Sequence, residues 1–225
     1  MTSSRRTSLT AGLLYLLTFV SIPTIAIYGQ VKETSYILSA GPDTSIIFGG
    51  ILEIIVALAG IATAVTLFPI LKKQREELAL GLVAARILES ATTFVGVAFI
   101  LSIVTLRQDG VGSGALVISN TLVALYNRIF LLGQSFMPAI CDVLLGFLLY
   151  KSRLVPRALS LIGIVGGPIL LVGYFAVMFG FVGRLAPLAA LSAVPVALFE
   201  FSLGLWLTFK GFSPSAFTKL TVKKE

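Results

Sequence analysis

The sequence contains no histidine and only one cysteine, Cys141. Without histidine, the chain lacks the commonest protein metal ligand and the commonest general base near neutral pH. One cysteine forms neither an internal disulfide nor a Cys-x-x-Cys site, so Cys141 is interpreted as a small apolar residue inside a helix. We therefore expect no bound metal, and no motif in the sequence indicates a cofactor.

Charged residues are also scarce. They make up 12% of the 225 residues, whereas 57% are hydrophobic. A soluble domain normally carries about 25% charged residues, so much of the surface of this protein must face lipid. The net charge of +7 does not indicate nucleic-acid binding, because no basic face is interleaved with aromatic residues. The lipid bilayer is the expected partner, and the oligomeric state is left open.

Long apolar runs are abundant, and six of them are long enough to cross a membrane as helices. Together they predict an all-α membrane protein with a single transmembrane bundle over residues 1–210 and a basic cytoplasmic tail over 211–225. The segment Gly114–Arg128 is apolar but short. It is expected to form an amphipathic, interfacial or partly inserted helix on the outer side, or an extension of the fourth run. The six runs are Leu9–Tyr28, Ser45–Leu71, Leu78–Leu106, Ile129–Tyr150, Ala158–Phe181 and Leu188–Phe209.

The distribution of lysine and arginine between the loops predicts the orientation. The positive-inside bias places both termini in the cytoplasm of a bacterial-type inner membrane. Met1–Tyr28 also has features of a signal peptide, but a first run that is retained as a span is the simpler interpretation. The side rich in cations holds Arg5, Arg6, Lys72, Lys73, Arg75, Lys151, Arg153, Arg157, Lys210, Lys219, Lys223 and Lys224, and the opposite side holds Lys32, Arg107 and Arg184.

Ionisable residues inside the apolar runs are the strongest indication of function. A charge at the bilayer centre costs at least roughly 2.5–3.5 kcal/mol, so each such residue should face the protein interior and have a partner. By helical rise, Arg86, Asp142 and Glu200 lie about 12–15 Å from the cytoplasmic ends of their helices, which predicts one cluster near the midplane. The candidate ligand- or ion-binding residues are Arg86, Glu89, Asp142, Glu200, Glu53, Arg128 at the outer edge and Gln134.

Small residues accompany these acids on the same helical faces. Such faces let helices approach closely in lipid, so the acids are expected at packing interfaces. Pro138, one turn before Asp142, is expected to open the helix backbone locally. The faces are Glu53, Ala57, Gly60 and Ala64 in the second run and Ala193, Ala197, Glu200 and Gly204 in the sixth.

Two interpretations of the cluster remain. The charges either pair only to fix helix register, or they form a site for a proton, a cation or a small polar solute. Acids outnumber Arg86, and pairing alone would not need the surplus, so we favour a small transporter or permeation-type protein. One alternative is a non-catalytic partner or sensor subunit that docks a protein through its basic loops, 72–77 and 151–157. Another is an intramembrane hydrolase that uses paired carboxylates, although an enzyme is the less expected class.

Three short segments together resemble a known family. They are Ala11–Leu17, the Arg86-Ile-Leu-Glu89 pair, and Tyr150–Leu159 followed by the helix with Gly163 and Gly167. They are similar to the bacterial multi-pass membrane proteins grouped as domain of unknown function 4386. The resemblance covers most of the chain and implies this architecture, but it implies no activity. Ser160 stands where that family often has glycine.

Overall fold

The computed structural model describes residues 3–110, 112, 114–184 and 186–222. Lys223 and Lys224, two of the cations used to predict orientation, fall outside these residues. All regular elements in the described part of the chain are helical, and six units are long and apolar enough to cross a membrane. The predicted all-α, six-span membrane protein is thus confirmed. The α-helices are α1 (Ser3–Leu17), α2 (Thr24–Val31), α3 (Thr44–Leu71), α4 (Glu76–Gln108), α5 (Ala115–Phe130), α6 (Met137–Ser152), α7 (Arg157–Met178), α8 (Pro187–Phe209) and α9 (Pro214–Val222).

The first span is broken, whereas the sequence predicts one continuous helix. After α1 the chain forms a 3₁₀ segment, η1 (Thr18–Ser21), and a turn at Ile22 and Pro23 before α2 begins. Pro23 has no amide hydrogen to continue the helical ladder. The hydroxyls of Thr18 and Thr24 donate to the carbonyls of Tyr15 and Ser21, each at 2.7 Å. Polar side chains therefore stabilise the break.

The fourth span is longer than predicted. α5, a π-helical segment η3 (Leu131–Phe136) and α6 form one continuous helical run of 38 residues. Of the alternatives for Gly114–Arg128, the structure shows the extension of the fourth span. The π-helical turn directly precedes Pro138, where the sequence predicts a local opening. Gly133 lies within this turn, at a point where a side chain would collide with Thr92 of α4.

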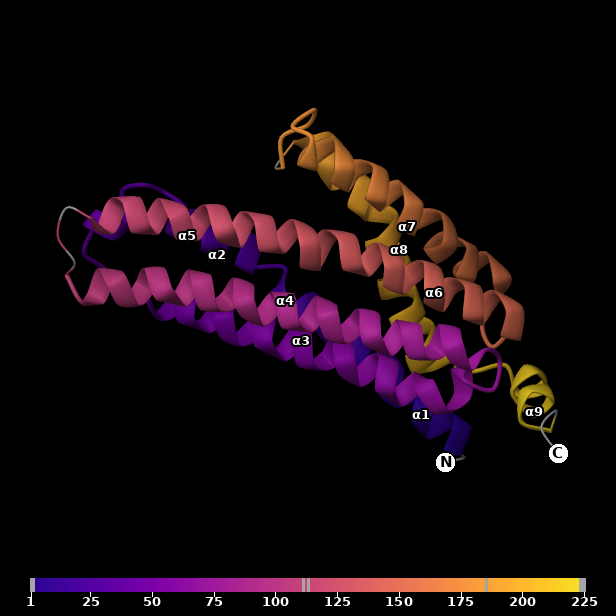
Figure 1. The fold of residues 1–225 in the computed structure, drawn as a ribbon. Coiled ribbons are helices and arrows are strands. Elements are labelled where there is room, and N and C mark those ends of the chain that lie inside the picture. The colour runs from indigo at the N-terminus through magenta and orange to yellow at the C-terminus, as the bar shows by residue number, and fades with distance from the viewer. Residues whose placement is uncertain (1–2, 111, 113, 185, 223–225) are drawn as a thin grey trace.

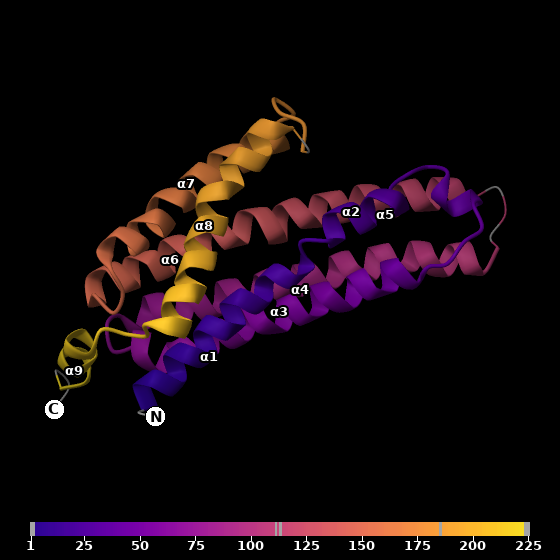
Figure 2. The ribbon, with the colours of Figure 1, turned by 180° about the vertical axis from the view of Figure 1, so that it is seen from behind.

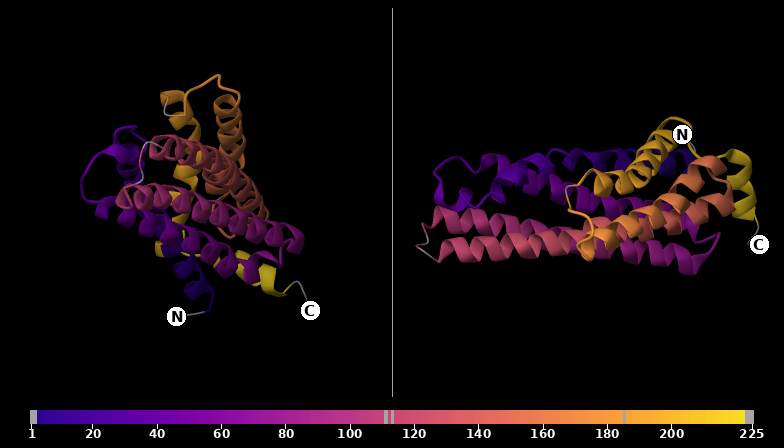
Figure 3. Two further views of the ribbon diagram at one scale, coloured as in Figure 1. Left: turned by 60° about the vertical axis from the view of Figure 1, so that its left-hand side comes forward. Right: turned by 90° about the horizontal axis from the view of Figure 1, so that it is seen from above.

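The spans form two diverging arms. Figure 1 shows one arm made of α2, α3, α4 and α5, and a second arm made of the α7–α8 hairpin. The arms meet where α1, α6 and α9 lie, at the end that also holds both chain termini (Figure 2). We call this the terminal end. The opposite end, where α4 and α7 end and α5 and α8 begin, we call the distal end. The left view of Figure 3 shows the same divergence from another direction.

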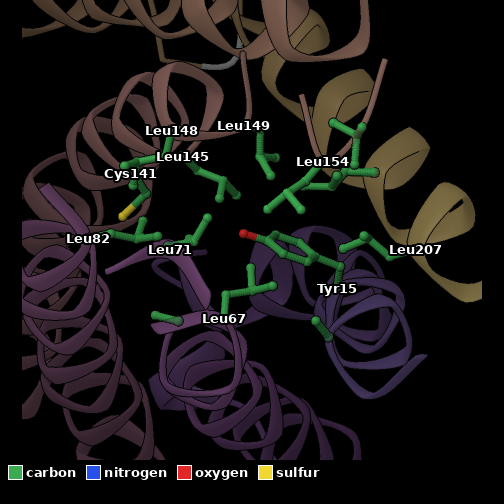
Figure 4. Packing of buried hydrophobic residues seen from close by; sticks show 14 of the residues in the cluster. Tyr15, Leu67, Leu71, Leu82, Cys141, Leu145, Leu148, Leu149, Leu154 and Leu207 are labelled. Atoms are coloured by element: carbon green, nitrogen blue, oxygen red, sulfur yellow. The ribbon is translucent and has the colours of Figure 1, made fainter. Parts of the chain in front are cut away.

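A leucine-rich core closes the terminal end of the bundle. Leu67, Leu71, Leu82 and Leu145 are each at most 1% exposed. Figure 4 shows Leu67, Leu71 and Leu145 on the side of the core that faces the Tyr15 ring, and Leu82 farther from it, beside Cys141. α3, α4 and α6 contribute these leucines, and Tyr15 belongs to α1. Leucines from three helices thus pack together at the terminal end of the bundle.

Glycines in α7 let this helix pack closely against α8 and α6. A side chain at Gly163 would collide with Phe199 of α8, and one at Gly167 would collide with Ala139 and Val143 of α6. Packing through small residues, which the sequence predicts for the second and sixth runs, is therefore also present in α7. In α3, Glu53, Ala57, Gly60 and Ala64 are all buried, whereas in α8 Ala197 is exposed.

The tail after Phe209 packs against the bundle through α9. Phe212 is buried, and the Ser213 amide donates to the Leu154 carbonyl at 2.9 Å. From the other terminus, Arg5 donates to the carbonyls of Leu207 at 3.1 Å and Thr208 at 2.6 Å. Positive charge at a helix C-terminus is favourable, so Arg5 stabilises the end of α8.

Candidate functional site

Arg86 lies at the centre of a buried cluster of charges. Its side chain, on α4, is 3% exposed. Its Nη1 atom is 3.2 Å and 3.0 Å from the two carboxylate oxygens of Glu89, and its Nη2 atom donates to Glu200 of α8. The guanidinium carbon lies 5.7 Å from the centre of the Tyr15 ring. The pairing of Arg86 with Glu89 and Glu200 that the sequence predicts is present.

The ion pair between Arg86 and Glu200 joins the two arms. α4 belongs to the first arm and α8 to the second, and these two helices are not a closely packed pair. Each packs instead against other helices: α4 against α3, α5 and α6, and α8 against α7 and α1. The bond therefore bridges elements whose backbones scarcely touch.

Asp142 is the least satisfied member of the cluster. It is 0% exposed, and neither carboxylate oxygen has a hydrogen-bond partner among the described residues. Glu200, Arg86 and Glu89 are its charged neighbours. Depth along the helices made Asp142 and Glu200 equally good candidates to pair with Arg86, and Glu200 holds that position. The cluster thus contains three carboxyl groups and one guanidinium.

Cys141 belongs to the edge of the same cluster. Its sulfur lies 3.6 Å from a carboxylate oxygen of Glu89, a contact that the interpretation of Cys141 as an apolar residue does not include. The thiol is buried, as that interpretation expects. In the part of the chain that the structure describes, no three histidine, cysteine, aspartate or glutamate residues converge as metal ligands.

Polar side chains extend the cluster along α4 toward the distal end. The Ser90 hydroxyl donates to the Ala57 carbonyl of α3 at 2.7 Å. Thr93 donates to the Glu89 carbonyl at 2.9 Å, and Gln134 of η3 donates to the Thr93 hydroxyl at 3.4 Å. Gln134, a predicted candidate, is therefore linked through Thr93 to the backbone of Glu89 and not to a charged side chain.

Two predicted candidates lie outside the cluster. Glu53 is 3% exposed and accepts a hydrogen bond from Thr24 at 3.3 Å, so it pairs with the start of α2. Its second oxygen and the Tyr28 hydroxyl have no hydrogen-bond partner in the described ranges. Arg128 is exposed on α5. By helical rise, both residues were already expected nearer the outer face than Arg86, and they do not reach its cluster.

The distal end holds a second arginine cluster that the sequence did not reveal. Arg107, at the end of α4, donates to Asp43 at 2.9 Å and to the carbonyls of Ser39 at 2.9 Å and Gly41 at 2.8 Å. Asp43 also accepts from Gln108 at 3.0 Å and from the Tyr36 hydroxyl. The available signal was the presence of opposite charges, Asp43 and Arg107, at neighbouring ends of two long apolar runs.

Hydrogen bonding decides the charge state of this distal acid. Burial alone would raise the pKa of Asp43, but hydrogen bonds from Tyr36 and Gln108 and the charge of Arg107 outweigh it. The pKa of Asp43 is therefore held below its usual value. Burial and the hydrogen bond to Asp43 raise the pKa of the Tyr36 hydroxyl to about 12. Near neutral pH, Asp43 is thus ionised and accepts hydrogen bonds from Arg107, Gln108 and Tyr36.

Comparison with known proteins identifies a family and no activity. No curated protein and no solved structure matches the chain. A family model described as "Domain of unknown function (DUF4386)" matches residues 10–211, which include five of the six spans in full, most of the first span and the cluster around Arg86. Because the match extends over most of the chain, the protein belongs to this family of multi-span proteins of unknown function.

Proposed function

We propose that the protein is a small transporter or permeation-type membrane protein in which Arg86, Glu89, Asp142 and Glu200 bind a proton, a cation or a small polar solute. One observation carries the proposal: the Asp142 carboxyl is fully buried and has no hydrogen-bond donor among the described residues. An ionised carboxylate in such a place is unfavourable by several kcal/mol unless a positive charge compensates it.

The positive charge of Arg86 is already shared. Two carboxylates, Glu89 and Glu200, hold the guanidinium through its two terminal nitrogens. Asp142 therefore needs positive charge from elsewhere, and a proton or a cationic group supplies it. Polar groups buried in a membrane protein are expensive and commonly mark the route of an ion or a proton.

The helices around the cluster have the irregularities that membrane transporters use. The first span is broken at residues 18–23, and the π-helical turn η3 directly precedes the helix of Asp142. Such interruptions recur at binding sites, where they free backbone groups or shift side chains. The Lys and Arg bias supports an inner membrane with the terminal end in the cytoplasm. In this orientation, leucines such as Leu71 and Leu145 must separate before a solute exchanges with the cytoplasm.

Proton flux through purified protein in liposomes tests the proposal. A potassium diffusion potential drives the flux, and a pH-sensitive dye inside the vesicles reports it. We expect flux with the wild type and a loss to the protein-free level with Asp142→Asn, because the amide takes up no proton. Glu77→Gln, at an exposed acid of α4, is the matched control and should leave the flux unchanged.

Competition between cations and protons extends the test to other solutes. A cationic solute that shares the site should slow proton flux in the wild type, in proportion to its occupancy. Equal flux through the wild type and Asp142→Asn would overturn the proposal. So would wild-type vesicles that conduct neither protons nor added cations above the protein-free background.

A further inference from the structure

Two cations from distant parts of the chain meet over one pair of aromatic rings at the distal end. The Lys32 amine lies 4.3 Å from the centre of the Tyr126 ring. The guanidinium carbon of Arg184 lies 4.1 Å from the centre of the Phe130 ring and 5.7 Å from that of Tyr126. Lys32 follows α2, whereas Arg184 belongs to the loop between α7 and α8. Both side chains are half-buried.

Neither cation has an acidic partner at contact distance. The salt bridges among the described residues involve neither Lys32 nor Arg184. Arg184 donates to the side-chain oxygen of Asn127, and no hydrogen bond within the described residues satisfies the Lys32 amine. Glu53 is a charged neighbour of both cations but is beyond salt-bridge distance. Arg184 also interacts with the Tyr126 hydroxyl, and the Lys32 amine is the donor group that the described residues leave without a hydrogen bond.

Lys32 titrates closer to neutral pH than an ordinary lysine because of this arrangement. Burial and, after it, the charge of Arg184 lower the pKa of Lys32 to about 8, against the opposing charge of Glu53. Burial also lowers the pKa of Arg184. The charged groups that face Lys32 are thus Arg184 from the α7–α8 loop and Glu53 from α3, with the titratable Tyr126 hydroxyl on α5. Two like charges held together without an anion are unfavourable, and an anion between them would remove the cost.

We propose that Lys32 and Arg184 form an oxyanion-binding site on the distal face, with the Tyr126 and Phe130 rings as its floor. The ligand is a carboxylate or phosphate group that accepts charge-assisted hydrogen bonds from both side chains. The planar guanidinium offers several donors in fixed directions, which suits such a group. The inference goes beyond the proposed function, because it holds whether or not Asp142 binds a proton.

Lys72 provides a matched comparison within the same chain. It also follows the C-terminal end of a long helix, α3, and its amine lies 5.5 Å from the centre of the Phe68 ring. It is exposed, and no second cation shares its ring. A lysine that only caps a helix and covers an aromatic ring should behave as Lys72 does. Lys32 differs from Lys72 in two ways: it is half-buried, and it lies beside Arg184.

Thermal unfolding of the purified full-length protein with inorganic phosphate tests the site. Chloride at equal ionic strength is the reference. We expect phosphate to raise the melting temperature of the wild type below pH about 8. Above this pH, where Lys32 loses its proton, the increase in melting temperature should disappear. Lys32→Gln and Arg184→Gln should each weaken phosphate binding by roughly tenfold or more, since each removes a charge-assisted bond. Lys32→Arg should retain binding, including above pH about 8, and Lys72→Gln should match the wild type.

A second arm of the experiment separates a free anion from a lipid headgroup. The same variants are placed in nanodiscs of neutral lipid, with or without anionic phospholipid. Stabilisation by soluble phosphate alone identifies a free solute, and stabilisation by anionic lipid alone identifies a headgroup. Equal stabilisation of the wild type, Lys32→Gln and Arg184→Gln in both arms would overturn the site. Loss of stabilisation in Lys72→Gln as large as in Lys32→Gln would do so too.

Discussion

The two arginine clusters of this protein are built from similar parts and differ in how completely they are satisfied. Each sets an arginine near a tyrosine ring, Arg86 at 5.7 Å from that of Tyr15 and Arg107 at 4.4 Å from that of Tyr36. Arg107 bonds one acid and two carbonyls, and Asp43 receives three donors. Around Arg86, three acids surround one guanidinium. The Nε atom of Arg86 and both carboxylate oxygens of Asp142 have no hydrogen-bond partner within the described chain.

The comparison shows how many bonds are enough to hold one segment of the protein against a neighbouring helix. At the distal end, one acid and two backbone carbonyls are enough to fix the loop between α2 and α3 against α4. A cluster that served only to hold helices would need no more than that. The surplus acid at Arg86 adds desolvation cost without adding a bond, so anchoring does not account for it. This contrast is the structural reason for proposing a binding role for Asp142.

The largest difference should appear when each arginine is removed. Arg86→Ala leaves Glu89, Glu200 and Asp142 without a compensating charge, which typically costs about 3–5 kcal/mol. Arg107→Ala leaves Asp43 bonded to Tyr36 and Gln108 near the surface, so we expect a cost of about 1–3 kcal/mol. Reversible unfolding in mixed detergent micelles measures both. If Arg107→Ala lowered the free energy of unfolding as much as Arg86→Ala or more, the surplus of acids around Arg86 would make no difference to stability.

Neutralising the acids should have opposite consequences at the two sites. Asp43→Asn loses charge-assisted bonds to Arg107 and Tyr36, and we expect a loss of about 1–3 kcal/mol. Asp142→Asn loses no hydrogen bond and removes like-charge repulsion, so its thermal stability should equal or exceed that of the wild type. The measurement is the melting temperature of both variants side by side. Destabilisation by Asp142→Asn as large as that by Asp43→Asn would contradict the view that Asp142 is unpaired.

A smaller effect is expected when acid titrates the distal cluster. The pKa of Asp43 is below its usual value, so the carboxylate contributes stability above the unfolded value of about 3.9, and this is lost as pH falls through the folded pKa. Hydrogen exchange of residues 39–43, corrected for its intrinsic pH dependence, should therefore accelerate in acid. Asp43→Asn should lack this step. A wild-type profile without it would mean that Arg107 does not depend on the charge of Asp43.

Local sequence patterns predicted the spans and the heart of the cluster. The length of an apolar run and the spacing of residues along a helix are local properties, so the six spans and the convergence of Arg86, Glu89 and Glu200 followed from them. The break after Leu17 did not follow, because a proline inside an apolar run either kinks or interrupts a helix. The π-helical turn before Pro138 was likewise foreseen only as an opening of unspecified kind.

Contacts made by the loops were beyond the reach of these patterns. Lys32, Asp43, Arg107 and Arg184 all lie near helix ends, where the path of the connecting chain decides which side chains meet. Arg184 reaches the rings of α5 from the loop between α7 and α8, and no periodicity along the chain predicts that contact. Glu53 is buried on its small-residue face as expected, but its partner, the first residue of α2, did not follow from the pattern.

The unequal lengths of the arms have a consequence for how the protein responds to its membrane. α4 has 33 residues and spans about 50 Å, whereas α7 has 22 and spans about 33 Å. Both must cross the same hydrocarbon layer, which is about 30 Å thick. They therefore cross at different tilts, which matches the divergence in Figure 1. In a thicker bilayer the helices of the long arm would tilt less from the bilayer normal, and the angle between the arms would narrow. Bilayer thickness therefore acts directly on the ion pair between Arg86 and Glu200.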